Sequence, residues 1–433
     1  MRLGGRIQAA IEVMEDVQNR RRPIAEALKD WGLSHRFAGS GDRAVIGNLA
    51  YDALRWRAST RWLMDSDKAS SLIIGTVVYR WNKPWAELEA ELEGDKFAPV
   101  LPSKAKREAA DSRNLDEAPD WIQANLPKWL VPHFQANFED DWIAEAQALA
   151  GRPPLDLRVN TLKSDREKEL KELENLGAEA TQISTNGLRI PPSEGARRHP
   201  NVQVEESYQR GRIEIQDEAS QIASELIFAQ PGETVLDFCA GAGGKTLSLA
   251  ASMQNSGKLY AYDVDRNRQA GIFERLDRAG ADQTIVLKPE DKRLAGLLGK
   301  CDRVVVDAPC TGSGTWRRKP DAKWRLTDKQ LQARQSEQQV VLEEAAQFVA
   351  QDGFLVYMTC SVLGAENEDS VASFLNGNPA FEMVSAGEVW QDLYGFDKPH
   401  PWSADMMSVT LTPASTNTDG FYFAVMQNLS SGA

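Results

Sequence analysis

The carboxyl-terminal half of the chain alternates short apolar runs with stretches of helical periodicity, and this alternation restricts the possible folds more than any other feature. Five runs rich in β-branched and aromatic residues mark the expected strands: TVLDF, LYAYD, TIVLK, RVVVD and FLVYM. Strands separated by helices form parallel sheets through right-handed βαβ crossovers. We therefore expect an α/β, doubly wound Rossmann-like domain over residues 210–433, with GFYFAVMQ as a candidate last, antiparallel strand at or near the sheet edge.

The first 135 residues have a different, helical pattern. Ile7, Ile11 and Met14 recur at helical spacing, and a second amphipathic segment, GDRAVIGNLAYDALRWRA, has Asp42 as a plausible N-cap. Residues 136–209 mix strand-like runs (PLDLRVNTL and LRI) with one helical segment. The sequence therefore predicts three parts: an all-α domain at 1–135, a small α+β subdomain at 136–209 and the α/β domain at 210–433.

Composition excludes several functional classes. The 433-residue chain has a net charge of −13, which argues against nucleic-acid binding by the whole surface and restricts any such binding to local basic patches. No apolar run approaches the ~18 residues of a membrane span, so we expect a cytoplasmic protein, and we expect it to be a monomer. The four cysteines form no C-x-x-C pair, and none of the four histidines is near them in sequence, so neither a metal site nor a disulfide framework is expected.

A glycine-rich turn follows the first expected strand. The segment DFCAGAGGKT runs from Asp237 to Thr246 and leads into a helical pattern. A Walker A loop needs glycine where Cys239 stands, and a dinucleotide fingerprint that starts at Gly241 needs glycine where Thr246 stands. Both alternatives fail. What remains is the G-x-G-type turn of a nucleoside-binding sheet, with free N–H groups at the start of a helix.

Acidic residues follow the next expected strands. Asp263 ends the second strand about 20 residues after the turn, where an acid binds a ribose diol. The third strand leads to Glu290 and Asp291, near an adenine position, and the fourth ends at Asp307. An Asp at a strand end is often only a helix N-cap. Together, however, the turn and the acids favour S-adenosylmethionine (SAM) over a nicotinamide cofactor, whose fingerprint fails.

Two cysteines stand directly after the last two of these strands. Cys310 follows RVVVD in DAPC, and Cys360 follows FLVYM in TCS. If the two strands are neighbours, as in the usual doubly wound order, both thiols face one cleft at the ligand-binding edge. A buried structural cysteine is the ordinary alternative. The flanking Asp-Ala-Pro and Thr/Ser residues at the cofactor edge favour a catalytic role.

A thiolate beside a methyl donor has a well-defined use. Carbon 5 of cytosine is not nucleophilic, but attack of a thiolate on carbon 6 makes it an enamine carbon that can take a methyl group. Loss of the carbon 5 proton then expels the sulfur. A carboxyl at Asp307 could hydrogen-bond the ring edge and favour the attack.

Three motifs carry a resemblance to a known family. The segments DFCAGAGGKT, DAPCTGSGTWRRKPDAKW and TCSVLGAENE resemble those of the Sun/RsmB-type RNA cytosine-5 methyltransferases. The upstream segments IQDEAS and RVNTLK extend the likeness, and GDRAVIGNLAYDALR is similar to the NusB-like helical domain of RsmB-type members. The resemblance implies a SAM-dependent enzyme that acts on RNA, most often 16S rRNA of the small subunit, with a NusB-like RNA-binding domain at residues 1–135.

The resemblance also implies roles for single residues. Cys360 would be the nucleophile, Cys310 would assist proton removal and product release, and Asp307 would lie near the methyl group and the target base. Asp263 would bind the ribose and Asp291 would lie near the adenine. The methionine and ribose side of SAM would be lined by Cys239, Ala240, Gly241, Ala242, Gly243, Gly244 and Lys245. The family's usual Ala-Ala-Pro-Gly-Gly-Lys turn has lost its proline here, which loosens the turn but keeps the glycines and the lysine.

A basic segment directly follows the Cys310 turn. Arg317, Arg318 and Lys319 are placed to hold phosphates that flank a target cytosine in a loop or flipped out of its stack, although a solvated surface is the plainer interpretation of such a charge run. The same chemistry on tRNA, and a non-catalytic RNA-binding or assembly factor, are the alternatives to rRNA methylation. The presence of both thiols and both acids argues against the non-catalytic factor.

Overall fold

A computed structural model describes residues 1–193, 195–399 and 401–430, and the chain forms two compact units. Unit 1 contains Met1–Pro153, Pro192–His199 and Thr315–Leu326, and unit 2 contains Pro154–Pro191, Pro200–Gly314 and Thr327–Ala433. The segment after the Cys310 turn thus belongs to the helical unit, although its neighbours in sequence on both sides belong to the α/β unit. The predicted division at residues 135 and 209 stays a prediction.

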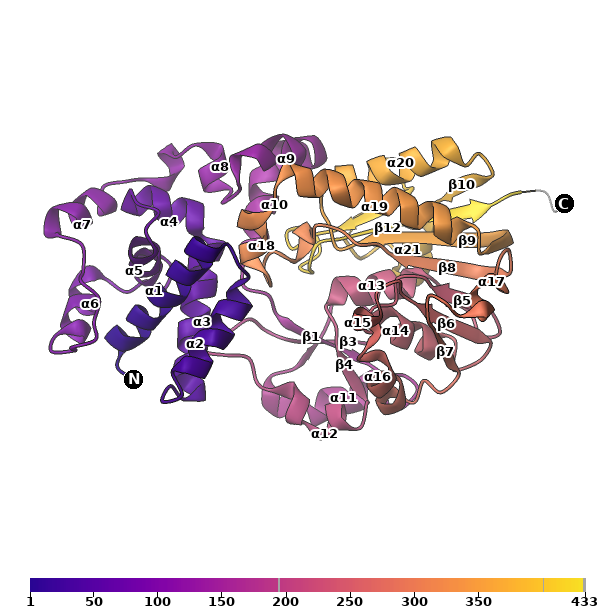
Figure 1. Ribbon diagram of the computed structural model, residues 1–433, viewed down its shortest axis with the longest axis horizontal. Coiled ribbons are helices and arrows are strands. Elements are labelled where there is room, and N and C mark those ends of the chain that lie inside the picture. Colours follow the sequence, from indigo (N-terminus) through magenta and orange to yellow (C-terminus); the bar gives the residue numbers. More distant parts are fainter. Residues whose placement is uncertain (194, 400, 431–433) are drawn as a thin grey trace. The chain divides into compact units, whose positions relative to one another are not determined.

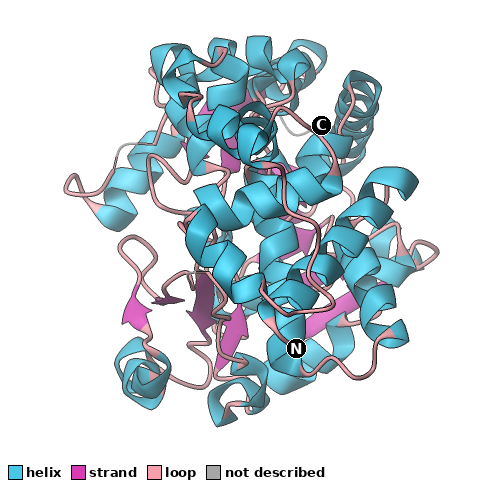
Figure 2. Ribbon diagram, turned by 90° about the vertical axis from the view of Figure 1, so that its left-hand side faces the viewer, coloured by secondary structure: helices cyan, strands magenta, loops and turns pink. Residues whose placement is uncertain are grey.

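Unit 1 is built from helices, as its apolar spacing predicts (Figure 2). Its core contains Ile7 and Met14 of the first helix, together with Ile46 and Leu49 of the third. The predicted N-cap at Asp42 is wrong: the third helix begins at Ser40, and the Asp42 carboxylate binds Arg6 and the terminal amine instead. The helices are α1 (Leu3–Arg20), α2 (Ile24–Ser34), α3 (Ser40–Arg55), α4 (Arg57–Met64), α5 (Ala69–Tyr79), α6 (Trp85–Leu92), α7 (Lys104–Asp111), α8 (Asp120–Gln123), α9 (Val131–Phe138), α10 (Trp142–Ala148) and α18 (Pro320–Arg325).

The large sheet of unit 2 confirms the doubly wound α/β prediction. Its order is β10-β12-β9-β8-β5-β6-β7, with β11 paired to β12, and β7, β6, β5, β8 and β9 run parallel. The last strand is antiparallel, as expected, and lies between β9 and β10. The strands are β5 (Thr234–Asp237), β6 (Lys258–Tyr262), β7 (Thr284–Leu287), β8 (Cys301–Asp307), β9 (Val349–Thr359), β10 (Phe381–Val384), β11 (Ser408–Leu411) and β12 (Phe421–Asn428).

Helices cover both faces of this sheet (Figure 1). One core cluster packs the sheet against α13 (Glu218–Leu226), α14 (Gly244–Ser252), α16 (Ile272–Ala279) and α21 (Ala386–Tyr394). The other packs the opposite side chains against α19 (Asp328–Ala346) and α20 (Glu368–Gly377). Because strands buried on both faces need apolar residues at every position, the five runs read as continuous rather than alternating. The short helices α15 (Arg266–Gln269) and α17 (Lys292–Ala295) follow β6 and β7.

A small antiparallel sheet precedes the large one in unit 2. Its order is β2-β3-β1-β4, made by β1 (Leu155–Val159), β2 (Glu179–Ala180), β3 (Gly187–Ile190) and β4 (Ile213–Ile215). The helices α11 (Arg166–Glu172) and α12 (Glu206–Gln209) accompany it, and Leu157, Leu188 and Ile213 form its core. The predicted strand in PLDLRVNTL and the one at LRI are both present.

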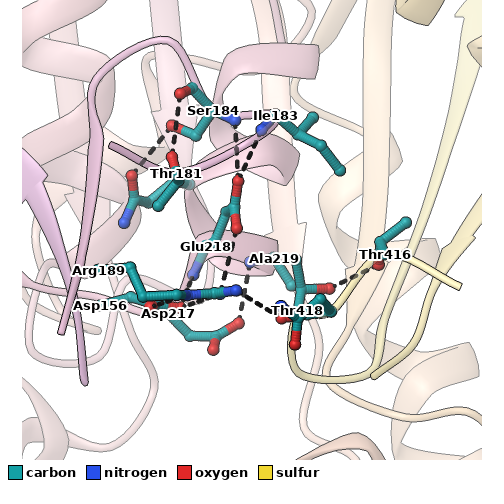
Figure 3. Close-up of polar contacts among 12 residues, drawn as sticks. Asp156, Thr181, Ile183, Ser184, Arg189, Asp217, Glu218, Ala219, Thr416 and Thr418 are labelled. Atoms are coloured by element: carbon teal, nitrogen blue, oxygen red, sulfur yellow. Dashed lines mark hydrogen bonds and ion pairs between the residues drawn. The ribbon is translucent and has the colours of Figure 1, made fainter. Parts of the chain in front are cut away.

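A buried polar network fixes the small sheet to the large one within unit 2 (Figure 3). Arg189 on β3 forms a bidentate ion pair with Asp156 on β1, at 2.7 and 2.8 Å. It forms a second ion pair with Glu218 at the start of α13, at 3.1 Å. Glu218 accepts the backbone N–H groups of Ile183 and Ser184. A third donor of Arg189 reaches the carbonyl of Asn417, in the loop before β12. The network thereby joins β1 and β3 of the small sheet to α13 and to the loop before β12.

No helix among the described residues is both long enough and apolar enough to cross a membrane.

Candidate active site

The two thiols predicted to share a cleft lie side by side. Cys310 follows the end of β8 and Cys360 follows the end of β9, and the two strands are parallel neighbours that pair Asp307 with Met358. The Sγ atoms of Cys310 and Cys360 are 3.3 Å apart, within hydrogen-bonding distance for sulfur, and both cysteines are free. The expectation that adjacent strands deliver both thiols to one place is confirmed.

The surroundings of Cys310, Cys301 and Cys239 raise the pKa of each thiol. The neighbouring Cys360 sulfur, burial and the charge of Glu366 raise the pKa of Cys310 well above that of an ordinary thiol, so Cys310 holds its proton. Burial likewise raises the pKa of Cys301 to about 12, and that residue lies at the far end of β8 from Cys310. Burial and nearby carboxylates also raise the pKa of Cys239 in the glycine turn. A protonated Cys310 is therefore placed to donate to Cys360.

A lysine links the glycine turn to the acid beside the thiols. Lys245, the second residue of α14, lies 3.4 Å from the carboxylate of Asp307 and donates to the Ser220 hydroxyl at 2.6 Å. Its ammonium also lies over the ring of Phe421 at 4.5 Å. Lys245 is almost fully buried, whereas a third of the Asp307 side chain is exposed at 33%. The carboxylate thus remains accessible to a ligand while the lysine holds it in place.

The glycine turn after β5 has the backbone that its sequence predicts. Gly241 and Gly243 have φ values of 50° and 86°, in the left-handed region that side chains rarely adopt. A Cβ atom at Gly243 would also lie 2.7 Å from Ile272, which closes that position to any other residue. Gly244 starts α14 and has open space where a Cβ would stand. The free N–H groups at the start of α14 are thus approachable, as a nucleoside ligand requires.

The acids after β6 and β7 differ in their surroundings. Asp263 is buried and accepts the N–H of Gly241 on Oδ2 and that of Asp265 on Oδ1, each at 2.9 Å. Arg268 also lies 3.5 Å from Oδ2, so Oδ1 is the oxygen that keeps acceptor capacity. Asp291 caps α17 and pairs with Arg293, which lowers its pKa to about 2. Glu290 pairs with Arg266. The ribose role of Asp263 and the adenine role of Asp291 stay predictions.

One acid at the site was not singled out from the sequence as a site residue. Asp237 ends β5 and is fully buried, with one oxygen accepting from Thr246 at 2.6 Å. Its Oδ1 atom has no hydrogen-bond partner among the described residues. Burial raises its pKa to about 7. An orphaned acceptor beside a glycine turn fits a ligand that carries a hydrogen-bond donor, such as the amino group of SAM.

The protonation of Asp237 makes stability depend on pH. Because its folded-state pKa of about 7 is raised from 3.8, its contribution is fully present below pH 3.8 and is lost as pH rises through about 7. We expect Asp237→Asn to remove this dependence, so that wild-type stability relative to the variant falls by about 2 kcal/mol between pH 5 and 8. Urea unfolding across this range measures it. The exposed Asp277→Asn is the control, and wild-type and Asp237→Asn curves that run parallel would contradict the assignment.

The basic segment after Cys310 is only partly accessible. Arg317 is 3% exposed and its carbonyl accepts from Arg55 at 2.6 Å, within unit 1. Trp316 stacks on Phe134 in the same unit. Arg318 is half-buried and Lys319 is exposed. The RNA contacts of Arg317, Arg318 and Lys319 stay predictions, and Lys319 is the member whose side chain reaches solvent.

No cluster of three or more potential metal ligands occurs among the residues that the structure describes.

Comparison with known proteins places the chain. Residues 225–427 match the family model for "16S rRNA methyltransferase RsmB/F", and residues 126–192 match the "Methyltr_RsmF/B-like, ferredoxin-like domain". A "Ribosomal RNA small subunit methyltransferase B" from Sodalis glossinidius is 30% identical, over 89% of each chain. The chain belongs to the RsmB/F methyltransferase family. An enzyme of the same name from Cronobacter sakazakii is 27% identical over 96% of each chain.

A solved structure of the same fold supports this placement. A methyltransferase homolog protein from Pyrococcus horikoshii superposes with a TM-score of 0.59 at 25% identity, covering 73% of this chain and all of that one. The chain is thus a SAM-dependent methyltransferase with the Rossmann-like fold of the RsmB/F family. The residues of its turn fit that cofactor, because the turn offers N–H donors, an orphaned Asp237 oxygen and the carboxylate of Asp263.

Proposed function

We propose that the chain methylates carbon 5 of a cytosine in 16S rRNA of the small ribosomal subunit, through a covalent bond between Cys360 and carbon 6 of the base. The observation that carries the proposal is the pair of thiols, 3.3 Å apart, at the carboxyl ends of two neighbouring parallel strands. The family membership and the printed names of the relatives support rRNA as the substrate.

The arrangement supports a nucleophile and a proton carrier with distinct roles. Addition of the Cys360 thiolate to carbon 6 forms a carbon–sulfur bond and makes carbon 5 nucleophilic, since the ring double bond moves toward it. SAM, when bound, supplies an electrophilic methyl group. Solvent water then takes the carbon 5 proton as the base, the electron pair of the broken carbon–hydrogen bond restores the ring double bond, and the carbon 6–sulfur bond breaks to release Cys360 as thiolate. The raised pKa of Cys310 keeps a proton beside the Cys360 sulfur, which stabilises that thiolate as it leaves.

Asp307 contacts the cytosine base, and Lys245 holds Asp307 in place. The Asp307 carboxyl group stands at the end of the strand that leads to Cys310, and its exposed part is free to accept from the amino edge of a cytosine. Lys245 holds Asp307 from the buried side, because its other partners, Ser220 and the Phe421 ring, fix the ammonium in place. Lys319, exposed after the thiol turn, is our candidate for a phosphate contact.

The test is methyl transfer from labelled SAM to total RNA from cells that lack the activity. Bisulfite sequencing of the product then locates any 5-methylcytosine. We expect one methylated cytosine in 16S rRNA, and the Cys360→Ser variant is the matched control for background labelling. Methylation of tRNA instead would keep the chemistry and overturn the substrate. No transfer to any RNA by protein that still binds SAM would overturn the proposal.

A further inference from the structure

A buried carboxylate, whose charge also raises the pKa of Cys310, binds both thiol loops. Glu366 ends the 3-10 turn η7 (Gly364–Glu366) and is fully buried. No ion pair of Glu366 is found among the described residues, so uncharged donors alone compensate its burial. A buried carboxylate without such donors would be strongly unfavourable. The residues that supply these donors therefore show which segments the carboxylate connects.

The donors come from both thiol loops. Thr311, the residue after Cys310, gives Glu366 its backbone N–H at 2.8 Å and its hydroxyl at 2.5 Å. Ser361, the residue after Cys360, donates its hydroxyl to the same carboxylate at 2.6 Å. The two neighbours of the reactive thiols, 50 residues apart in sequence, thus share one acceptor.

A second layer of buried hydrogen bonds holds the same arrangement. Gln338 of α19 donates to Glu366 at 3.1 Å and to the carbonyl of Pro309 at 3.0 Å. The hydroxyls of Ser313 and Ser361 are 2.8 Å apart, which joins the loops again one turn further on. Gln338, Ser313 and Ser361 are all fully buried. Such a network, satisfied at each member, permits one geometry of the loops.

We propose that Glu366 is the positioning residue of the two-thiol site, holding the Cys310 loop and the Cys360 loop at the separation that covalent catalysis requires. The proposal rests on the proposed function for its catalytic meaning, while the geometric claim concerns the free protein. Glu366 does not touch the substrate. It acts through Thr311 and Ser361, the residues that directly follow Cys310 and Cys360 in the chain.

Two variants separate geometry from charge. In Glu366→Ala the hydroxyls of Thr311 and Ser361 lose their shared acceptor, so the loops lose this tie and keep the contacts around Ser313. In Glu366→Gln the amide keeps one oxygen acceptor, and the two hydroxyls can rotate to accept from its nitrogen. The exposed Asp369→Asn, three residues away, is the matched carboxyl-to-amide control.

The first measurement needs neither RNA nor SAM. The oxidant diamide takes two electrons and two protons from two thiols that approach each other and leaves a disulfide, which peptide mass spectrometry detects. Because Glu366→Ala and Glu366→Gln both lack the carboxylate charge, the comparison between them isolates geometry. We expect the Cys310–Cys360 disulfide to form about tenfold or more slowly in Glu366→Ala than in Glu366→Gln, and Asp369→Asn to keep the wild-type rate. Equal rates in folded Glu366→Ala and Glu366→Gln would overturn the proposal.

The second measurement uses Glu366→Gln and tests whether the Glu366 carboxylate is held close to the Cys310 sulfur. It can be made even if the alanine variant does not fold. The groups that face the Cys310 sulfur are Cys360, Glu366 and Tyr357 of β9. Removing the charge of Glu366 lowers the pKa of Cys310, so its alkylation by iodoacetamide begins at lower pH. A profile identical to that of Asp369→Asn would overturn the role of the charge.

Activity then links the two proposals. On 16S rRNA we expect kcat of Glu366→Ala to fall by roughly 10²-fold with the SAM affinity unchanged, because a displacement of the reacting groups by ~1 Å has effects of that order. If wild-type protein transfers no methyl group but its thiols still cross-link in a Glu366-dependent way, the proposed function fails while the positioning role stands. If cross-linking and kcat are both unchanged in Glu366→Ala, the positioning role fails.

Discussion

Cys310→Ala is expected to accumulate an RNA–protein adduct that survives denaturing gels, whereas Cys360→Ala forms none. The two sulfur atoms are 3.3 Å apart, so either could in principle attack a bound base. Three influences raise the pKa of Cys310 and hold its proton: the Cys360 sulfur, burial and the charge of Glu366. In the proposed mechanism Cys360 is the nucleophile, so removal of Cys360 removes the covalent step.

The magnitudes differ as well as the trapped species. Loss of a nucleophile in covalent catalysis costs roughly 10⁴-fold or more in turnover, and we expect Cys360→Ala to fall in that range. Cys310→Ala also stops turnover, but only after addition to carbon 6, since release of the base then lacks its proton carrier. Single-turnover labelling from SAM would therefore show a methylated, protein-bound RNA in Cys310→Ala alone.

The control for this experiment is Cys301→Ser. Cys301 is fully buried and lies at the other end of β8, so the substitution alters a thiol of the same strand without touching the site. It should methylate as wild type does. An adduct in Cys360→Ala and none in Cys310→Ala would exchange the roles of the two cysteines.

Local pattern was sufficient for much of the fold. The five apolar runs became β5 to β9, and the adjacency of β8 and β9 followed from the usual order of such sheets. The strands β10 and β11 were missed, because FEMV and SVTL are antiparallel segments of four residues, too short to show a clear strand pattern. Antiparallel additions at a sheet edge carry a weaker sequence signal than buried parallel strands do.

The site residues that belong to a local motif were predicted, whereas contacts between residues far apart in sequence were missed. Cys310, Cys360 and Asp307 lie at strand ends, so a sequence argument reaches them. The bond between Lys245 and Ser220 joins two helices, and that between Thr311 and Glu366 joins two loops, across 25 and 55 residues. Only tertiary structure brings such pairs together. Glu366 stands in TCSVLGAENE, but the burial that makes donors necessary is a tertiary property.

The second large effect concerns stability, and Arg189→Met is expected to lower the free energy of unfolding by about 4 kcal/mol. Arg189 is the cation that faces two buried carboxylates, Asp156 and Glu218, which are 1% and 0% exposed. Methionine fills a similar volume but leaves both acids without their positive partner. The expected loss is large because an uncompensated buried charge is more costly than a missing surface pair.

The dependence of this loss on pH distinguishes charge from packing. Burial already raises the pKa of Glu218, and Arg189 is one of the groups that lower it, so the substitution raises that pKa further. A carboxyl whose folded-state pKa is raised contributes stability that is present at low pH and lost as pH rises through that pKa. The deficit of Arg189→Met relative to wild type should therefore be smaller at pH 5 than at pH 8. A defect of packing alone would be the same at both.

Urea unfolding at the two pH values measures the effect, with Arg210→Met as the matched control. Arg210 belongs to the same unit and pairs with Glu206, but both side chains are largely exposed, so its loss should cost less than about 1 kcal/mol. Arg189→Lys keeps the charge without the two-pronged geometry and should lie between the two. If Arg189→Met were no less stable than Arg210→Met, the link between the small sheet and α13 would have to rest on apolar contacts. The backbone N–H groups of Ile183 and Ser184 would then suffice to stabilise the buried Glu218.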